Sequence, residues 1–125
     1  MLPHEEWLFK AQNDLDSAEY LLTSVKPFYD IVVYHAQQCA EKSLKAFLAF
    51  KEQEIEKVHN LLVLVNRCSM LDKEFDQLKS EALFLNPYAT IYRYPEGDLL
   101  PSKKEVEQAM AAASKILDFV RNRTV

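Results

Sequence analysis

The stretch Phe28–Lys51 decides the fold: it reads FYDIVVYHAQQCAEKSLKAFLAFK and contains neither glycine nor proline. Its apolar residues fall on most sides of the helical repeat, from Ile31 and Val32 to Leu48 and Phe50. A helix that is apolar around most of its circumference is surrounded by neighbours in the folded protein. The pattern therefore predicts a long central helix, with the remaining segments packed around it.

One side of this predicted helix is polar. At 100° per residue, a stripe of four side chains lies within about 80° of the circumference. Its members are His35, Gln38, Lys42 and Lys45. Glu41 lies about 40° beyond the stripe and is spaced to pair with Lys45 across one turn. The stripe is either the solvated face of the helix, a groove for an anionic or polar ligand, or the polar part of a subunit interface.

Four further segments show helical periodicity. The first runs from Glu5 to Thr23, with an apolar face at three- and four-residue steps and with Asp14 assigned to the polar side. The others run from Val58 to Met70, from an N-cap at Asp72 to Leu85, and from the capping-box pattern Ser102–Glu105 to Val120. The sequence thus predicts an all-α protein of about five helices.

Composition excludes several kinds of protein. Gly97 is the only glycine among 125 residues, so neither a P-loop nor a Rossmann phosphate loop can be present. Residues that favour tight turns are too few for a sandwich or barrel of many strands. The length predicts a single domain over residues 1–125.

Charge and cysteine content narrow the setting. The net charge of -4 argues against a broad nucleic-acid surface. No apolar run approaches the roughly 20 residues of a membrane span, and the acidic N-terminus is unlike a signal peptide, so we expect a cytoplasmic protein. Cys39 and Cys68 show no ligand spacing and are expected to be reduced core residues. The three histidines are far apart, so no metal site is expected.

Two more places are candidates for function. His59 is expected in the first turn of the third helix, either as a packing residue or as a contact to a carboxylate or ligand. Arg93 lies between two tyrosines in the long stretch Pro87–Pro101, where it either stacks on rings and binds an anion or clamps the loop to an acidic residue. Long ordered loops with aromatic residues are often functional.

These residues together resemble those of the HEPN domain family, named for nucleotide binding in higher eukaryotes and prokaryotes. The similarity runs from about residue 5 to residue 123. The segments that carry it are Trp7 and Ala11 before Asp14-Leu15-x-x-Ala18, then Ala36-Gln37-Gln38-x-Ala40-Glu41-Lys42-x-Leu44-Lys45-Ala46, then His59-x-Leu61-x-x-Leu64, and finally Tyr92-x-Tyr94-Pro95 around Arg93.

The resemblance implies an up-and-down antiparallel bundle of four long helices plus a short fifth, similar to the C-terminal domain of kanamycin nucleotidyltransferase. It implies a homodimer that binds a nucleotide or substrate as the non-catalytic partner of a separately encoded minimal nucleotidyltransferase, with no cofactor. The residues that match the family's signatures, together with His35 of the stripe, are the candidate nucleotide- or substrate-binding residues: His35, Gln38, Glu41, Lys42, Lys45, His59, Arg93 and Tyr94.

The chain departs from many members of the family in lacking the motif of their ribonuclease site. Many HEPN proteins are metal-independent ribonucleases with a histidine four to six residues after an arginine. Here the last histidine, His59, precedes every arginine, so that motif is absent and no catalytic residue is assigned. A toxin-like ribonuclease built from distant residues, such as His59 with Arg93, remains the alternative. A purely structural interaction module is the second alternative.

Overall fold

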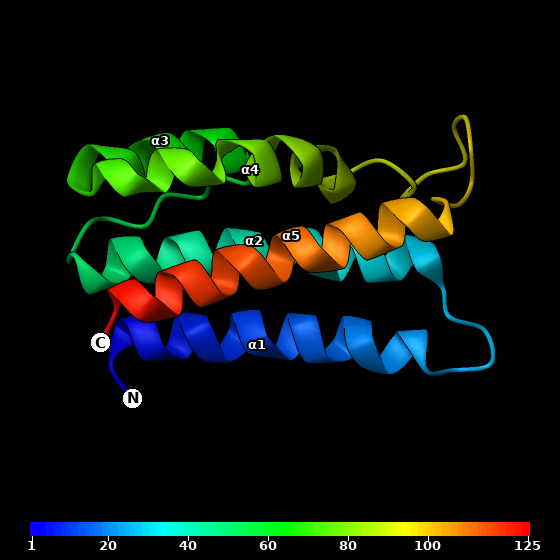
Figure 1. Cartoon of the computed structure of the whole chain (residues 1–125), viewed down its shortest axis with the longest axis horizontal. Helices are drawn as coiled ribbons and strands as arrows, with labels where there is room; N and C mark the ends of the chain where they lie inside the picture. The colour runs from blue at the N-terminus through cyan, green and yellow to red at the C-terminus, as the bar shows by residue number, and fades with distance from the viewer.

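The computed structural model describes residues 1–125 and contains five α-helices and no strand, which confirms the predicted all-α class (Figure 1). Two short 3-10 helices accompany them. In chain order the elements are α1 (Pro3–Leu22), α2 (Tyr29–Phe50), α3 (Leu61–Leu71), the 3-10 helix η1 (Lys73–Leu78), α4 (Lys79–Leu85), the 3-10 helix η2 (Asn86–Ala89) and α5 (Lys103–Arg123).

The ends of the three long helices lie close to those predicted. Helix α1 begins at Pro3, two residues earlier than expected, because proline fits the first position of a helix, where its missing N–H is not needed. Helix α2 lies within one residue of the predicted range at each end. At the start of α5 the Ser102 hydroxyl accepts from the Glu105 N–H, and the Glu105 carboxylate accepts from the Ser102 N–H, which confirms the capping box.

The third helix begins later than predicted. Its N-cap is Asn60, whose side-chain oxygen accepts from the N–H groups of Leu62 and Val63, so α3 starts at Leu61 rather than at Val58. His59 therefore lies in the connection before the helix and not in its first turn. An asparagine is a strong N-cap because its oxygen satisfies N–H groups that have no partner within the helix.

The fourth helical segment is divided. Asp72 acts as the predicted N-cap and accepts from the Glu74 N–H, but the helix that follows is η1, and α4 begins only at Lys79. The expected apolar stripe is nevertheless buried, since Phe75 and Leu78 are spaced for a three-residue turn and Ala82 and Leu85 continue the same face. The apolar pattern thus predicted which side is buried but not the type of helix.

The connection between α2 and α3 doubles back along the bundle. His59 lies beside Glu41, whereas Cys68, one element later, donates through its thiol to the Leu44 carbonyl. Helix α3 therefore runs in the same direction as α2, and α4 returns antiparallel to it (Figure 1). This course carries residues 51–60 past the polar side of α2, which matters for the site described below.

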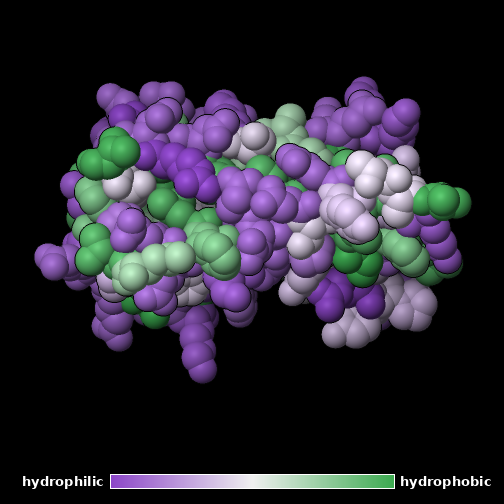
Figure 2. Space-filling model, turned by 90° about the horizontal axis from the view of Figure 1, so that it is seen from below, coloured by the Kyte–Doolittle hydropathy of each residue, from purple (hydrophilic) through white to green (hydrophobic).

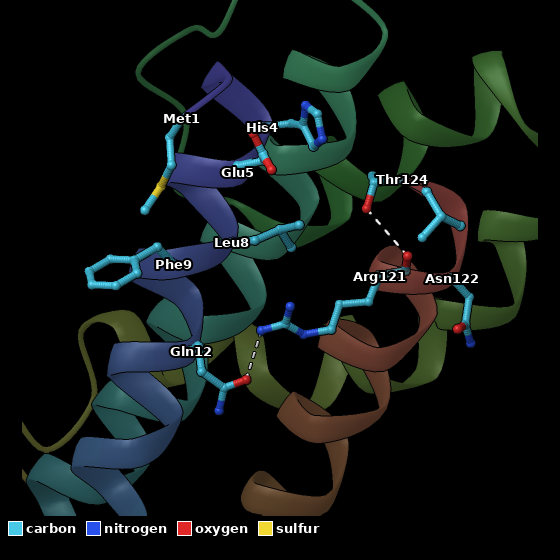
Figure 3. Close-up of a pocket in the computed structure, with 10 residues that line it drawn as sticks. Met1, His4, Glu5, Leu8, Phe9, Gln12, Arg121, Asn122 and Thr124 are labelled. Atoms are coloured by element: carbon cyan, nitrogen blue, oxygen red, sulfur yellow. Dashed lines mark hydrogen bonds between the residues drawn. The ribbon is translucent and has the colours of Figure 1, made fainter.

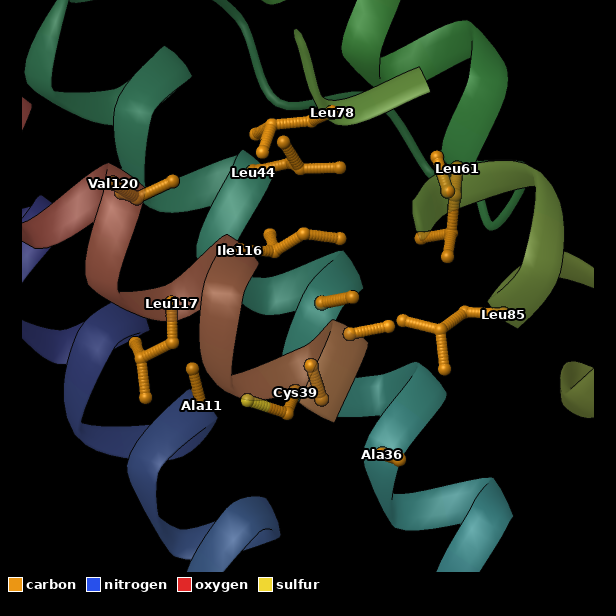
Figure 4. Packing of buried hydrophobic residues seen from close by; sticks show 14 of the residues in the cluster. Ala11, Ala36, Cys39, Leu44, Leu61, Leu78, Leu85, Ile116, Leu117 and Val120 are labelled. Atoms are coloured by element: carbon orange, nitrogen blue, oxygen red, sulfur yellow. The ribbon is translucent and has the colours of Figure 1, made fainter. Parts of the chain in front are cut away.

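The core forms around α2, which packs against α1, α3, α4 and α5. Figure 4 shows Ile116, Leu117 and Val120 of α5 beside Leu44 and Cys39 of α2. Leu61, Leu78 and Leu85 belong to the same buried cluster and close it from the other side. The prediction that residues 28–51 form the central helix is confirmed.

The surface is less uniform than the core. None of the helices is long and apolar enough to cross a membrane. On the side where α1 lies in front, hydrophobic side chains appear at both ends of the molecule and polar ones cover the middle (Figure 2). Exposed apolar residues at these two ends include Leu2 and Phe9 near the chain termini and Val25 and Phe28 in the α1–α2 connection.

Candidate functional site

A buried aspartate on α1 joins two members of the predicted polar stripe. Asp14 is only 8% exposed. One of its carboxylate oxygens lies 2.9 Å from Nδ1 of His35, and the other accepts from Nζ of Lys42 at 2.6 Å. His35 and Lys42 are thus held on the outward side of α2 by a single carboxylate from the neighbouring helix. The assignment of Asp14 to the solvated side of α1 was wrong.

The ionised form of Asp14 is favoured despite its burial. Burial by itself raises the pKa of this carboxyl, but the hydrogen bonds from His35 and Lys42 outweigh it and hold the pKa below its usual range. A carboxyl whose pKa is lower in the folded chain stabilises the fold above its unfolded pKa of about 3.9, and this stabilisation is lost as the pH falls through the folded value.

We expect Asp14→Asn to lower the free energy of unfolding at pH 7 and to flatten its decline below about pH 4, since asparagine cannot ionise. Urea unfolding followed by circular dichroism between pH 3 and 7 measures this profile. Asp16→Asn is the matched control because Asp16 is exposed on the same helix. A pH profile for Asp14→Asn that overlays the wild-type profile would contradict the assignment.

A second buried carboxylate has the same kinds of partner. Glu41, which is 4% exposed, accepts from Nζ of Lys45 at 3.1 Å, as the spacing predicted. Both of its oxygens lie 3.2 Å from Nδ1 of His59. Lys45 is itself only 5% exposed, with its ammonium 5.6 Å from the centre of the Trp7 ring. Lys45 is therefore a buried partner of Glu41 and not an accessible cation.

Two glutamine side chains extend the group around Glu41 through the His59 carbonyl. Nε2 of Gln38 donates to Oε1 of Gln37 at 2.8 Å, and Nε2 of Gln37 donates to the His59 carbonyl at 3.3 Å. Gln37 is fully buried. Together these side chains form what we call the α2 cluster, which consists of Asp14, His35, Gln37, Gln38, Glu41, Lys42, Lys45 and His59.

Arg93 reaches α2 from residues 87–101, which we call the aromatic loop. Its guanidinium carbon lies 4.0 Å from the centre of the Tyr34 ring, and that ring lies 6.0 Å from the ring of His35. Of the two alternatives for Arg93, the structure shows the ring contact, on a tyrosine of α2 and not on its own neighbours, and anion binding stays a prediction. Tyr94 is 71% exposed and lines a pocket beside the α1–α2 connection.

The aromatic loop is anchored to α5 through one carboxylate. The hydroxyls of Tyr88 and Tyr92 both donate to Oε2 of Glu105, at 2.8 and 3.2 Å. Burial raises the pKa values of both tyrosines, and the hydrogen bonds to Glu105 raise them further, so both hydroxyls are protonated donors at neutral pH. The anchor fixes the backbone on which Arg93 stands.

The structure therefore places six of the eight predicted site residues in two hydrogen-bonded groups, one around Asp14 and one around Glu41. Arg93 lies beside the first group, and Tyr94 lies farther along the loop. Asp14, Tyr34 and Gln37 were missed as site residues. A signal for Asp14 existed, because it lies three residues after Ala11 and four before Ala18, on the same side of α1 as these buried alanines. Gln37 lies among the apolar positions of α2, so its spacing gave no such signal, although it stands in the segment that carries the family resemblance.

The cluster offers hydrogen-bond donors that are fixed but not used up. Lys42 has three ammonium donors, of which Asp14 takes one. His59 faces Glu41 through Nδ1, so its neutral ring presents Nε2 as an acceptor and adds no donor, although the side chain is 72% exposed. The arginine ion pairs of the structure involve Arg67 and Arg123, so Arg93 keeps its donors for a ligand. Such donors suit an anionic group.

Other chemistry has less support. Burial raises the pKa values of Cys39 and Cys68 to about 12, so neither thiol is a nucleophile at neutral pH, as predicted. No three metal-ligating side chains come together in the structure.

A separate pocket of about 630 Å³ lies where the two chain termini meet (Figure 3). Met1, Leu8 and Phe9 form its apolar side, and Arg121 lies opposite them and donates to Oε1 of Gln12 at 2.8 Å. None of the predicted site residues lines this pocket. We take the α2 cluster with Arg93 as the candidate functional site because it holds seven of the eight predicted site residues.

Comparisons with known proteins show the family and the fold. The family model described as HEPN domain matches residues 4–123. The crystal structure of ST0689, described as an archaeal HEPN homologue, is similar over 100% of both chains, with a TM-score of 0.80 and 26% identity. The crystal structure of TT1696 from Thermus thermophilus is similar over 98% of both chains, with a TM-score of 0.76 and 27% identity. No curated protein matches the sequence. The chain belongs to the HEPN domain family.

Proposed function

We propose that this HEPN chain is a homodimeric, single-domain protein that binds a nucleotide or phosphorylated substrate on the outward side of α2, as the non-catalytic partner of a separate nucleotidyltransferase. The observation that carries the proposal is the arrangement of Lys42 and Arg93. Lys42 is held by the buried carboxylate of Asp14, and Arg93 by the ring of Tyr34, and both keep donors for a phosphate.

A cationic side chain that is already held by a partner within the protein is well suited to bind a phosphate. A lysine free in solvent loses side-chain freedom when it binds a ligand, whereas Lys42 is already fixed in position. The two lysines of the stripe differ in this respect, because Lys45 is enclosed by Glu41 and Trp7 while Lys42 is 25% exposed. We therefore assign the phosphate contact to Lys42 and a structural role to Lys45.

Titration of the purified protein with ATP tests the proposal. We expect saturable binding, weakened by roughly 10- to 100-fold in Lys42→Ala and in Arg93→Ala, which is the usual effect of losing a hydrogen bond to a charged group. Trp7, the only tryptophan, lies over Lys45 and provides a fluorescence signal, with calorimetry as an independent measurement.

The matched control is Lys115→Ala, which removes an ion-paired lysine on α5 and should leave binding unchanged. Absence of saturable binding, or equal binding by all variants, would reject the proposal. Incubation of the same samples with RNA separates binding from the ribonuclease alternative, since cleavage that disappears in His59→Ala would favour that alternative.

A further inference from the structure

An aromatic pocket of about 600 Å³ lies between the α1–α2 connection and the aromatic loop. Four aromatic side chains line it, namely Phe28, Tyr29, Tyr92 and Tyr94. Its size falls within the range of pockets that bind small molecules. Phe28 is 44% exposed and Tyr94 71% exposed, so much of the lining is apolar surface that faces solvent in this chain.

The backbone on both sides of this pocket is held in an unusual conformation. Phe28 has a φ of 49° and Tyr92 a φ of 67°, values in the left-handed region that bulky residues rarely adopt. Tyr92 is kept there by its hydroxyl bond to Glu105 and by stacking on Tyr88, with ring centres 6.1 Å apart. Strained residues of this kind gather at ligand-binding sites, and here both place aromatic rings in the pocket lining.

Arg93 connects the pocket to the α2 cluster. It lines the pocket, and its guanidinium lies over Tyr34, whose ring neighbours that of His35. Lys42 lies eight residues after Tyr34, which corresponds to about 12 Å along the axis of α2. A ligand with a ring in the pocket would therefore meet Arg93 first, and an anionic chain attached to the ring would extend toward Lys42.

We propose that the aromatic pocket holds the base of a nucleoside phosphate whose phosphates extend from Arg93 toward Lys42. This inference rests on the proposed function and adds to it where the base lies. Tyrosine and phenylalanine rings stack on nucleobases with little dependence on which base is bound, because every base has a flat aromatic face. The aromatic lining accordingly contributes affinity for the base, and the cationic side chains contribute affinity for the phosphates.

Comparison of ATP with inorganic triphosphate tests the position of the base. Two variants remove aromatic rings from the pocket, Tyr94→Ala and Phe28→Gly, and glycine tolerates the left-handed backbone at position 28. We expect each variant to bind ATP at least fivefold more weakly and inorganic triphosphate as tightly as the wild type. Lys42→Ala should weaken the binding of both ligands. Tyr20→Ala is the control, because Tyr20 is 76% exposed and does not line the pocket.

The possible failures can be told apart. If the wild type binds ATP but both pocket variants bind it equally well, the base lies elsewhere and only this inference is overturned. The inference is also overturned if the variants lose ATP and inorganic triphosphate to the same extent, since the rings would then act on the phosphate site. If the wild type binds neither ligand, the proposed function fails and this inference fails with it.

Discussion

Replacement of Glu41 with alanine is expected to lower the free energy of unfolding by about 3–5 kcal/mol, the cost of leaving a buried charge without its partner. Glu41 and Lys45 are 4% and 5% exposed, and the carboxylate is the ion-pair partner of the Lys45 ammonium. His59 also loses a partner, but its side chain is 72% exposed, so water replaces the contact. Urea unfolding followed by circular dichroism measures the loss.

A double variant separates the charge from the packing. Glu41→Gln combined with Lys45→Met removes both charges at nearly constant volume and should recover most of the stability lost in Glu41→Ala. Glu56→Ala is the matched control, because Glu56 pairs with Arg67 at the surface and such pairs contribute at most about 1 kcal/mol. Equal losses in Glu41→Ala and Glu56→Ala would show that the Glu41–Lys45 pair is not buried in solution.

Replacement of Phe75 with alanine is expected to cause a loss of similar size, about 3–5 kcal/mol, because it opens a cavity in the core. Phe75 is fully buried, and its ring centre lies 4.3 Å from that of Phe47 and 4.9 Å from that of Phe119. These rings join η1 to α2 and α5. The change therefore tests whether the 3-10 segment is held in place by its single aromatic side chain.

Phe9→Ala provides the comparison for the same chemical change at the surface. Phe9 is 51% exposed on α1, so we expect its replacement to alter the free energy of unfolding by no more than about 0.5 kcal/mol. Equal effects of Phe75→Ala and Phe9→Ala on the urea midpoint would contradict the packing described here. Retention of α-helical signal in Phe75→Ala at low urea would show that the loss is one of stability and not of fold.

Most of the fold could be predicted from local patterns. The apolar circumference of residues 28–51 predicted the central helix, and the Ser102–Glu105 pattern predicted the start of α5, because both depend on side chains within one or two turns. The predicted start of α3 at Val58 was wrong for a local reason, since Asn60 is a strong N-cap and the helix begins only after it. The 3-10 geometry of η1 was missed because its three-residue spacing also fits an α-helical stripe.

The candidate site was predicted only in part. Sequence spacing placed His35, Gln38 and Lys42 on one stripe, and the structure keeps them there. The sequence spacing did not show that Asp14 of α1 holds two of these side chains, or that the connection between α2 and α3 brings His59 to Glu41. These contacts join residues far apart in the chain, and periodicity carries no information about such pairs.

The sequence by itself determined that the chain is helical, which apolar residues form most of its core, and which side of α2 is polar, because burial follows from the spacing of apolar residues along each helix. Only the tertiary structure decided what the polar side chains do. Lys42 and Lys45 are alike in sequence, about one turn apart on the same stripe. Packing encloses Lys45 between Glu41 and Trp7 and leaves Lys42 partly exposed over Asp14. The reason is that α1 presents the large indole ring of Trp7 to Lys45 and the small carboxylate of Asp14 to Lys42.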